Sequence, residues 1–340
     1  MSDNLQLSDT TLRHQLEPPG ERRAVNFNHT SLQRGLRMGE TGLGPSVNAE
    51  GRVSFYLAAS QSENTRKAYA SDLQHFHKWG GTIPSSAETL AAYLADNATH
   101  LAVGTLKRRV AAIAWAHRHE AVSDPTKSEL IRKLMRGIKR HHGSRPSQAH
   151  PLLLRDIERI ALHCGDDPRP QRDLALLLVG YFGAFRASEL VALKIEDCLF
   201  ERNELLVHLR RSKTDQTAKG RWLRIPSGGE LSCPVTTARK WLVSLGRTDG
   251  PMFPSITRSG LIREMGITTR SLARIIAVRA KDAGIKTAGL SSHSLRAGYV
   301  TEALWAGMDP ALVAMQTGHT TVEMVMRYLR DRPSPNAVPR

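Results

Sequence analysis

The spacing of apolar and polar residues divides the first half of the chain into a patternless start and a helical region. Residues 1–51 are polar and dotted with glycines, so we expect a disordered N-terminal arm. From residue 52, apolar side chains recur every three or four positions, which is the spacing of amphipathic helices. Four such helices are predicted, within residues 62–80, 87–98, 103–119 and 127–143. Residues 52–143 therefore predict an all-α domain of four or more helices.

A second domain is predicted after a Gly-, Pro- and Ser-rich stretch at 144–151, which has the composition of a linker. It begins with an amphipathic helix at 152–164. The next run, 171–185, is so apolar that we expect it to be the central, buried helix of the domain. Another helix is predicted at 187–198.

The apolar period then changes from helical spacing to two. ELLVHLRRSKT and RWLRIP alternate apolar and polar residues around the polar segment DQTAKG, which predicts a β-hairpin. We expect the chain from Pro234 to Asp331 to be helical, and the three prolines of the tail at 332–340 to exclude a long helix there. The predicted fold class is mainly α, with a small β-hairpin or sheet in the domain at 152–331.

The charge of the chain indicates which class of partner it binds. There are 48 Lys and Arg residues against 32 Asp and Glu, a net charge of +16. Because the charge is clustered, it favours a protein that binds a polyanion such as DNA over a protein that is basic without such a partner. The clusters lie opposite the apolar faces of the third and fourth predicted helices. The candidate DNA contacts are Lys107, Arg108, Arg109, Arg132, Lys133, Arg136, Lys139 and Arg140.

The sequence has few features of membrane, secreted or metal-binding proteins. No apolar run approaches the ~18 residues of a membrane span, and the N-terminus lacks the apolar core of a secretion signal. Cys164, Cys198 and Cys233 lie far apart, without metal-ligand spacing, so we expect thiols in a reducing cytoplasm. The chain has neither a carboxylate cluster nor a Gly-rich phosphate loop, so neither of these patterns indicates a metal or a cofactor.

Candidate chemistry is concentrated between Leu290 and Asp331, which hold His293, Arg296, His319 and Tyr328. Three basic side chains followed by a phenol suggest a site that holds a phosphate and attacks it. Ser292 is predicted to cap a helix whose positive N-terminal end would carry the first of these residues. Taken alone, the tyrosine is better explained as a core-edge residue that uses its hydroxyl as a polar handle.

Two further candidates lie upstream. Arg186 and Glu189 are three residues apart and share one helical face, although a surface ion pair would account for them alone. Lys213 lies near the tip of the predicted hairpin, where exposed lysines are common.

The order of these residues, rather than any one of them, is specific. RASEL, a hairpin lysine, HSLRAG, TGH and then a tyrosine nine residues after that histidine resemble the phage-type tyrosine recombinases, the integrase family, and within it the Cre-type simple site-specific recombinases. NTRKAYASDLQHFHKW resembles the opening of the core-binding domain of that family. The resemblance covers 52–331 and implies a core-binding domain at 52–143 and a catalytic domain at 152–331 that close as a C-shaped clamp around DNA.

The resemblance also implies roles for the candidate residues. Tyr328 would be the nucleophile, forming a covalent 3′-phosphotyrosyl link and releasing a 5′ hydroxyl. Lys213 would be the general acid, with Lys219 as the alternative in the same hairpin, and Glu189 would support the basic residues. The residues that would bind the phosphate are Arg186, His293, Arg296 and His319.

The implied partner is duplex DNA with paired recombination sites, bound by a homotetramer with one dimer on each site. The implied setting is a bacterial, phage or plasmid system in which the enzyme acts on DNA in the cytoplasm, without ATP or metal. Only 12 residues follow Tyr328, and prolines break them, so the contact between subunits is not predicted. Two alternatives remain open: a type IB topoisomerase and a catalytically idle, architectural DNA-binding protein.

Overall fold

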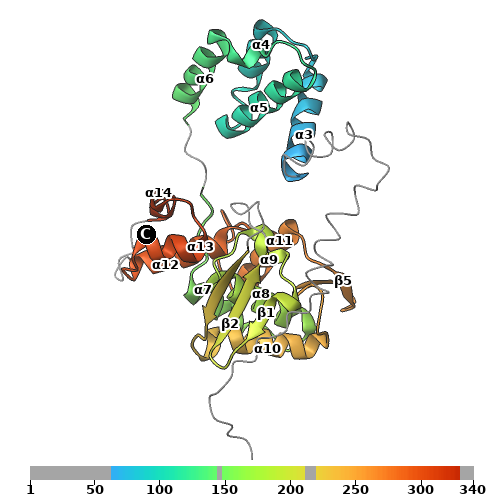
Figure 1. The fold of residues 1–340 in the computed structure, drawn as a ribbon. Helices are drawn as coiled ribbons and strands as arrows, with labels where there is room; N and C mark the ends of the chain where they lie inside the picture. The colour runs from blue at the N-terminus through green and yellow to red at the C-terminus, as the bar shows by residue number, and fades with distance from the viewer. Residues whose placement is uncertain (1–62, 144–147, 211–219, 330–340) are drawn as a thin grey trace, which may run out of the picture. The chain divides into compact units, whose positions relative to one another are not determined.

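The computed structural model describes residues 63–143, 148–210 and 220–329. The chain divides into two compact units, residues 1–146 and 147–340 (Figure 1), and each is considered by itself. The predictions for the N-terminal arm, for Lys213 and Lys219 and for the tail therefore lie outside the described residues.

The first unit contains the four predicted helices and no strand within its described residues. They are α3 (Glu63–Trp79), α4 (Ala87–Asn97), α5 (Val103–His119) and α6 (Glu129–His142), with a short 3₁₀ helix, η1 (Pro125–Lys127), before α6. Serines begin two of them: the Ser86 side chain accepts from the backbone N–H of Thr89, and that of Ser128 from Ile131. These caps satisfy backbone donors that a helix leaves unpaired at its start.

The core of the first unit is aromatic and aliphatic. Phe76 and Tyr93 are fully buried and meet edge to face with ring centroids 4.9 Å apart, in the geometry that aromatic pairs prefer. On α6 the inward-facing residues include Ile131 and Ile138, which are buried, whereas Leu130 is 45% exposed.

Arg109 also departs from its prediction. It is only 7% exposed, and its Nη1 donates to the hydroxyl of Tyr93 at 2.7 Å. Its Nε lies 3.6 Å from a carboxylate oxygen of Asp72. Arg109 is three residues after Leu106 and four before Ile113, both buried, so helical geometry turns it inward with them. It is an internal residue of this unit and not an exposed DNA contact.

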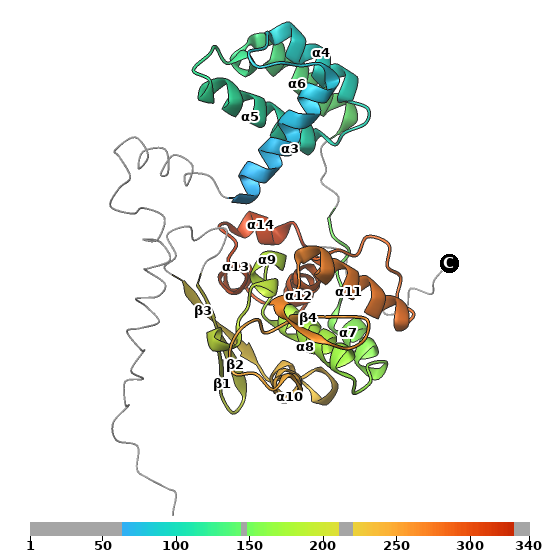
Figure 2. The ribbon, with the colours of Figure 1, turned by 90° about the vertical axis from the view of Figure 1, so that its right-hand side faces the viewer.

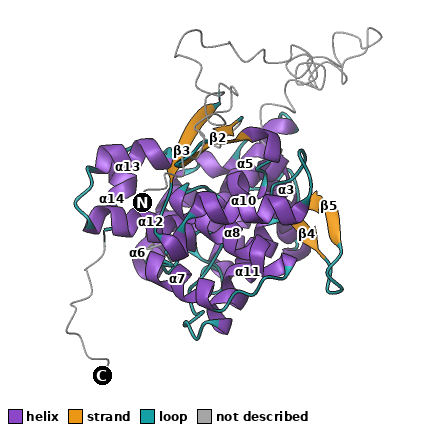
Figure 3. Cartoon of the chain, turned by 90° about the horizontal axis from the view of Figure 1, so that it is seen from below, coloured by secondary structure: helices purple, strands orange, loops and turns teal. Residues whose placement is uncertain are grey.

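The second unit is a mainly helical domain with two small antiparallel sheets, which confirms the predicted fold class (Figure 3). Its helices are α7 (Leu154–Leu162), α8 (Pro168–Phe182), α9 (Ala187–Val191), α10 (Pro234–Leu245), α11 (Thr269–Asp282), α12 (Ser294–Trp305), α13 (Pro310–Thr317) and α14 (Val322–Met326), with short 3₁₀ turns η2 (Ile195–Asp197) and η3 (Glu230–Ser232). None of the helices in the described ranges is long and apolar enough to cross a membrane.

The predicted hairpin is part of a three-stranded sheet with order β1 (Cys198–Phe200), β2 (Glu204–Leu209), β3 (Arg221–Pro226). A second sheet was not predicted. β4 (Pro254–Ile256) pairs with β5 (Ile262–Gly266), so the expectation of an entirely helical segment from Pro234 to Asp331 was wrong. A proline and the turn glycine Gly260, with φ of +88°, interrupt the helical pattern there.

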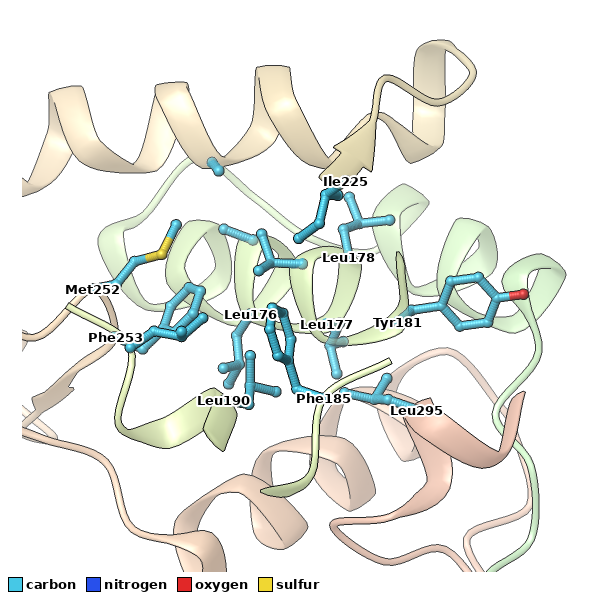
Figure 4. Close-up of a cluster of buried hydrophobic side chains, with 14 of the residues drawn as sticks. Leu176, Leu177, Leu178, Tyr181, Phe185, Leu190, Ile225, Met252, Phe253 and Leu295 are labelled. Atoms are coloured by element: carbon cyan, nitrogen blue, oxygen red, sulfur yellow. The ribbon is translucent and has the colours of Figure 1, made fainter. Parts of the chain in front are cut away.

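Helix α8 is the centre of the second core, as its apolar sequence predicted. Its residues from Ala175 to Tyr181 are all buried. Figure 4 shows Leu176, Leu177 and Leu178 surrounded by side chains from elements far apart in sequence, including Phe185, Leu190, Ile225 and Leu295. This core fixes the end of α8 and the start of α9, where the first candidate residue lies.

Helix α12 packs unusually close to the start of the unit. A Cβ added at Gly298 would lie 1.9 Å from the carbonyl oxygen of Leu152, so only glycine fits there. The Leu152 N–H also donates to the carbonyl of Ser294 at 3.0 Å. Helices α12, α13 and α14 then lie side by side (Figure 2) around a small core that includes Val313 and Val325. These three helices carry the rest of the candidate residues.

Candidate active site

Arg186 lies at the junction of α8 and α9, as the N-cap residue of α9. Its Nη1 donates to Glu189 Oε1 at 2.8 Å, and its backbone N–H donates to Glu189 Oε2 at 2.9 Å. Glu189 is only 6% exposed. One carboxylate therefore fixes both the backbone and the guanidinium of Arg186, and because that carboxylate is buried the pair is not an exposed surface ion pair.

The second guanidinium of the site belongs to Arg296 on α12, which is 3% exposed. Its Nη1 donates to the carbonyl oxygens of Ala184 and Thr317, both at 2.7 Å. Ala184 has φ of +45°, rare for a residue with a side chain. Burial first, and then the charge of Arg186, lowers the pKa of Arg296 to about 10, so it remains charged at neutral pH.

His319 follows the turn that ends α13. Gly318, the C-cap of that helix, has φ of +66°, a conformation that favours glycine. Arg296 Nη2 donates to His319 Nε2 at 2.9 Å, and the carbonyl of Gly318 accepts from Arg186 Nη2 at 2.7 Å. Burial, followed by the charges of Arg296 and Arg186, lowers the pKa of His319 to about 4. The imidazole is therefore neutral at pH 7.

Tyr328 lies against this group. Its ring centroid is 5.8 Å from that of His319, with an angle of 51° between the rings. It packs on the small core of α12, α13 and α14. The carbonyl of the preceding residue, Arg327, accepts from Gln148 Nε2 at 2.9 Å.

The helix before the tyrosine is shorter than predicted. Helix α14 ends at Met326, and Tyr328 is just beyond it. Of the apolar residues in and just after this helix, Val325 is fully buried, but Val322 is 39% and Leu329 53% exposed. A five-residue helix has little more than one turn, so its inward face holds only one of these side chains.

His293 begins α12, three residues before Arg296. The predicted cap, Ser292, is not used: His293 is itself the N-cap residue, and its backbone N–H donates to Ser291 Oγ at 3.2 Å. The Ser294 hydroxyl accepts from the N–H of Ser291 at 2.8 Å, so neighbouring serines close this turn. The side chain of His293 is exposed.

The sequence reasoning missed Arg221, the first residue of β3. Its Nη1 donates to the carbonyls of Met315 and Gln316, at 2.9 and 3.1 Å. A signal was available, because the alternation in RWLRIP puts Arg221 on the same inward face as the buried Leu223 and Ile225. Thr317 was missed too: it is fully buried, and its hydroxyl lies 2.7 Å from His319 Nδ1.

The structure thus brings together Arg186, Glu189, Arg296, His319 and Tyr328, while Lys213 lies outside the described residues. Two guanidiniums and a neutral imidazole beside a phenol can bind an anion and present a nucleophile to it. No group of three or more His, Cys, Asp or Glu residues that could hold a metal ion occurs in the described part of the chain.

Comparison with known proteins agrees with this chemistry. Residues 150–334 match the model of the phage integrase family. The integrase/recombinase xerD homolog of Selenomonas ruminantium is 33% identical over 283 residues, which are 80% of this chain and 83% of that protein. Recombinase cre of Escherichia phage P1 is 25% identical over 274 residues, covering 75% and 78%.

A solved structure shares the fold. It is that of a lambda integrase dimer bound to a COC′ core site, with a TM-score of 0.59, 16% identity, and coverage of 91% of this chain and 83% of that one. With more than half of the chain matched by the family model and most of it aligned to a recombinase at 33% identity, this protein belongs to the phage integrase family of tyrosine recombinases.

Proposed function

We propose that this protein is a site-specific DNA recombinase that cuts and rejoins DNA through a covalent 3′-phosphotyrosyl intermediate. The observation that carries the proposal is the convergence at the end of α13. The carbonyls of Thr317 and Gly318, adjacent in sequence, hold the guanidiniums of Arg296 and Arg186, and the ring of Tyr328 lies beside His319.

The arginines and the histidine bind the scissile phosphate. A phosphodiester repels an attacking oxygen by its own negative charge, so attack requires that this charge be neutralised and the phosphorus be held in line. Arg186 and Arg296 carry planar groups with permanent charge that match the non-bridging oxygens. His319 adds a hydrogen bond, and together they stabilise the charge that grows in the transition state.

Tyr328 is the nucleophile. Its oxygen attacks the phosphorus, a Tyr–O–P bond forms, and the bond from phosphorus to the 5′ oxygen breaks. The departing oxygen takes a proton from Lys213, the general acid in this proposal, and His293 assists in removing the proton of the tyrosine. Attack by a 5′ hydroxyl from a partner duplex reverses these steps, so the strands rejoin in a new pairing without ATP or metal.

The partner is duplex DNA with paired recombination sites in the cytoplasm, on which four copies assemble, two on each site. The lambda integrase relative crystallised as a dimer on a core site, which supports two copies per site. The DNA phosphates are contacted by exposed basic residues of two helices. These are Lys107 and Arg108 of α5 and Arg132, Lys133, Arg136, Lys139 and Arg140 of α6.

A nicked substrate tests the proposal. In a duplex built from the inverted repeats that flank the gene, a nick close to the cleavage point lets the short 5′ strand diffuse away, so that covalent protein–DNA adduct accumulates. Wild type should form the adduct, and Tyr328→Phe should bind the same duplex but form none. No adduct with wild type, or an adduct with Tyr328→Phe, would contradict the assignment.

Plasmids separate the proposal from its alternatives. A recombinase rearranges a plasmid that carries two sites and leaves a site-free supercoiled plasmid intact. A type IB topoisomerase relaxes the site-free plasmid, and an architectural protein binds both without cleaving either.

A further inference from the structure

Arg221 reaches from the sheet to the end of α13, into the immediate surroundings of the active site. Strand β3 directs it inward, and its Nη1 donates to two successive carbonyls, those of Met315 and Gln316. Its guanidinium lies against Gly318, whose carbonyl accepts from Arg186. It belongs to none of the motifs by which the site was found.

Four consecutive carbonyls at the end of α13 each accept from an arginine. Met315 and Gln316 accept from Arg221, Thr317 accepts from Arg296, and Gly318 accepts from Arg186. These arginines come from β3, α12 and the start of α9, which are remote in sequence. The carbonyl end of a helix attracts cations, so it is a natural place to gather three of them. The end of α13 is therefore the common support of the guanidiniums.

Stability alone does not account for an arginine at position 221. Its Nη2 is buried and has no hydrogen-bond partner among the described residues, and a buried N–H without a partner is unfavourable. Burial also lowers the pKa of Arg221, which shows that its charge is disfavoured there. The neighbouring inward positions hold Leu223 and Ile225, which meet no such difficulty.

The close packing of Gly318 gives the guanidinium a second function beyond its hydrogen bonds. A Cβ at Gly318 would lie 2.9 Å from Nη2 and 3.1 Å from Cζ of Arg221. The guanidinium therefore rests against the backbone of the residue whose carbonyl holds Arg186. A shift of Arg221 would therefore displace that carbonyl and, with it, His319, which is the next residue in the chain.

We propose that Arg221 is a positioning residue of the active site: it fixes the end of α13 so that the carbonyls of Thr317 and Gly318 hold Arg296 and Arg186 in place for the phosphate. The inference rests on the proposed function for its effect on cleavage. Its effect on the end of α13 does not depend on any reaction and is measured separately.

Cleavage is the first measurement. Arg221→Gln should form the adduct with the nicked duplex about 100-fold more slowly than wild type at saturating protein, the order of loss that follows a small misplacement of reacting groups. Arg221→Lys should not rescue it, because an ammonium, although it can donate to both carbonyls, lacks the planar group that lies against Gly318. Arg224→Gln is the matched control: Arg224 lies on the outward face of the same strand, is exposed, and pairs with Glu204. It should cleave within about twofold of wild type, as expected of surface substitutions.

The second measurement is the NMR titration of the His319 imidazole in the protein without DNA. If Arg221 holds the end of α13, Arg221→Gln should raise the pKa of His319 from about 4 toward its ordinary value, because a looser turn exposes the ring to water. Arg224→Gln should leave it at about 4. Thermal unfolding of each variant shows that the titration reports on folded protein.

The outcomes separate the two proposals. Wild-type cleavage rates in Arg221→Gln would overturn the inference while leaving the recombinase function intact. Slow cleavage with an unchanged His319 titration would overturn positioning through α13. If wild type itself forms no adduct, the proposed function fails, and the His319 titration alone decides: a raised pKa supports the role of Arg221, and an unchanged one overturns it.

Discussion

The hydroxyl of Thr317 lies 2.7 Å from Nδ1 of His319, and the neighbouring groups fix the direction of this hydrogen bond. Thr317 donates its one hydroxyl proton to the carbonyl of Val313 at 2.6 Å, so it accepts from the histidine. At the other ring nitrogen Arg296 can only donate, so Nε2 accepts. His319 is therefore the neutral, Nδ1-protonated tautomer in the protein without DNA, in agreement with its low pKa.

This relationship predicts that Thr317→Val, which keeps the volume of the side chain, loses activity. Without the hydroxyl, Nδ1–H has no acceptor and the ring is free to turn, so adduct formation should slow by about 10- to 100-fold, as with partners that orient other functional histidines. Thr317→Ser should retain most of the rate. ¹⁵N NMR of the ring checks the cause: Nδ1 should be the protonated nitrogen in wild type and Thr317→Ser but not uniquely in Thr317→Val.

Stability should depend on pH through His319. Its pKa is about 4 in the folded protein and near 6.5 when unfolded, so the unfolded chain binds the proton first as the pH falls. The contribution of the neutral ring is present above pH 6.5 and is lost as the pH falls from 6.5 to 4. After allowance for its partial exposure it is about 1–2 kcal/mol.

His319→Gln isolates this contribution from that of the other histidines. The loss in free energy of unfolding between pH 7 and pH 4.5, measured with urea, should be smaller in His319→Gln than in wild type. Equal losses in the two proteins would show that the histidine is not held neutral.

Arg186 should matter for cleavage far more than for binding. Arg186→Ala removes a transition-state contact from a preformed site, so adduct formation should fall about 10²- to 10³-fold, while affinity for the nicked duplex changes little because many other phosphate contacts remain. Arg202→Ala, an exposed arginine between β1 and β2, is the control and should change neither. A matching loss of affinity and rate in Arg186→Ala would instead place this residue in DNA binding.

Gly298 should tolerate no side chain. In Gly298→Ala the new Cβ would meet the Leu152 carbonyl, a backbone atom that cannot turn aside, so the second unit should lose about 2–3 kcal/mol of stability. Gly165→Ala is the matched control in the same unit, because a Cβ there meets nothing within 4 Å and its φ is not positive. Urea unfolding of both variants measures the difference.

The basic face of α6 should govern the salt dependence of DNA binding. Replacing Lys139 and Arg140 with Gln should weaken binding to all sequences and reduce the slope of log affinity against log salt by about 2, one for each lost phosphate contact. Arg109→Met should leave the slope unchanged and lower the stability of the first unit, because Arg109 is engaged internally with Tyr93 and Asp72. An equal change of slope in Arg109→Met would overturn its internal assignment.

Much of the fold could be predicted because periodicity reports which face of a helix is apolar. The four helices of the first unit and the buried α8 follow from that signal. It fails where a charged residue occupies an apolar phase, as Arg109 does, and where a helix is too short to have a face, as α14 is. The pair β4 and β5 was missed because each strand has at most five residues between a proline and glycines.

The order of the residues was enough to indicate which side chains form the candidate site. It did not indicate the contacts that hold them in place. Order and motif indicated Arg186, Arg296, His319 and Tyr328, which the fold does gather. The carbonyls that hold the arginines are backbone atoms, identical in every residue, so no sequence pattern marks Ala184 or Met315 as an acceptor. Arg221, in contrast, could have been found from the sequence, because the alternation of β3 puts it on the inward face of the strand.

The use of carbonyls as the acceptors has a consequence for the field of the site. Aspartates or glutamates in those places would have ordered the guanidiniums equally well, but each would have cancelled one positive charge. Among the contacts made by Arg186, Arg221 and Arg296 in the described residues, Glu189 is the one carboxylate. The cations are thus immobilised while an excess of about two positive charges is left for an incoming anion. Sulfate or inorganic phosphate should therefore bind at this site and compete with DNA. Either anion should weaken DNA binding more than chloride does at the same ionic strength, since chloride acts by screening alone.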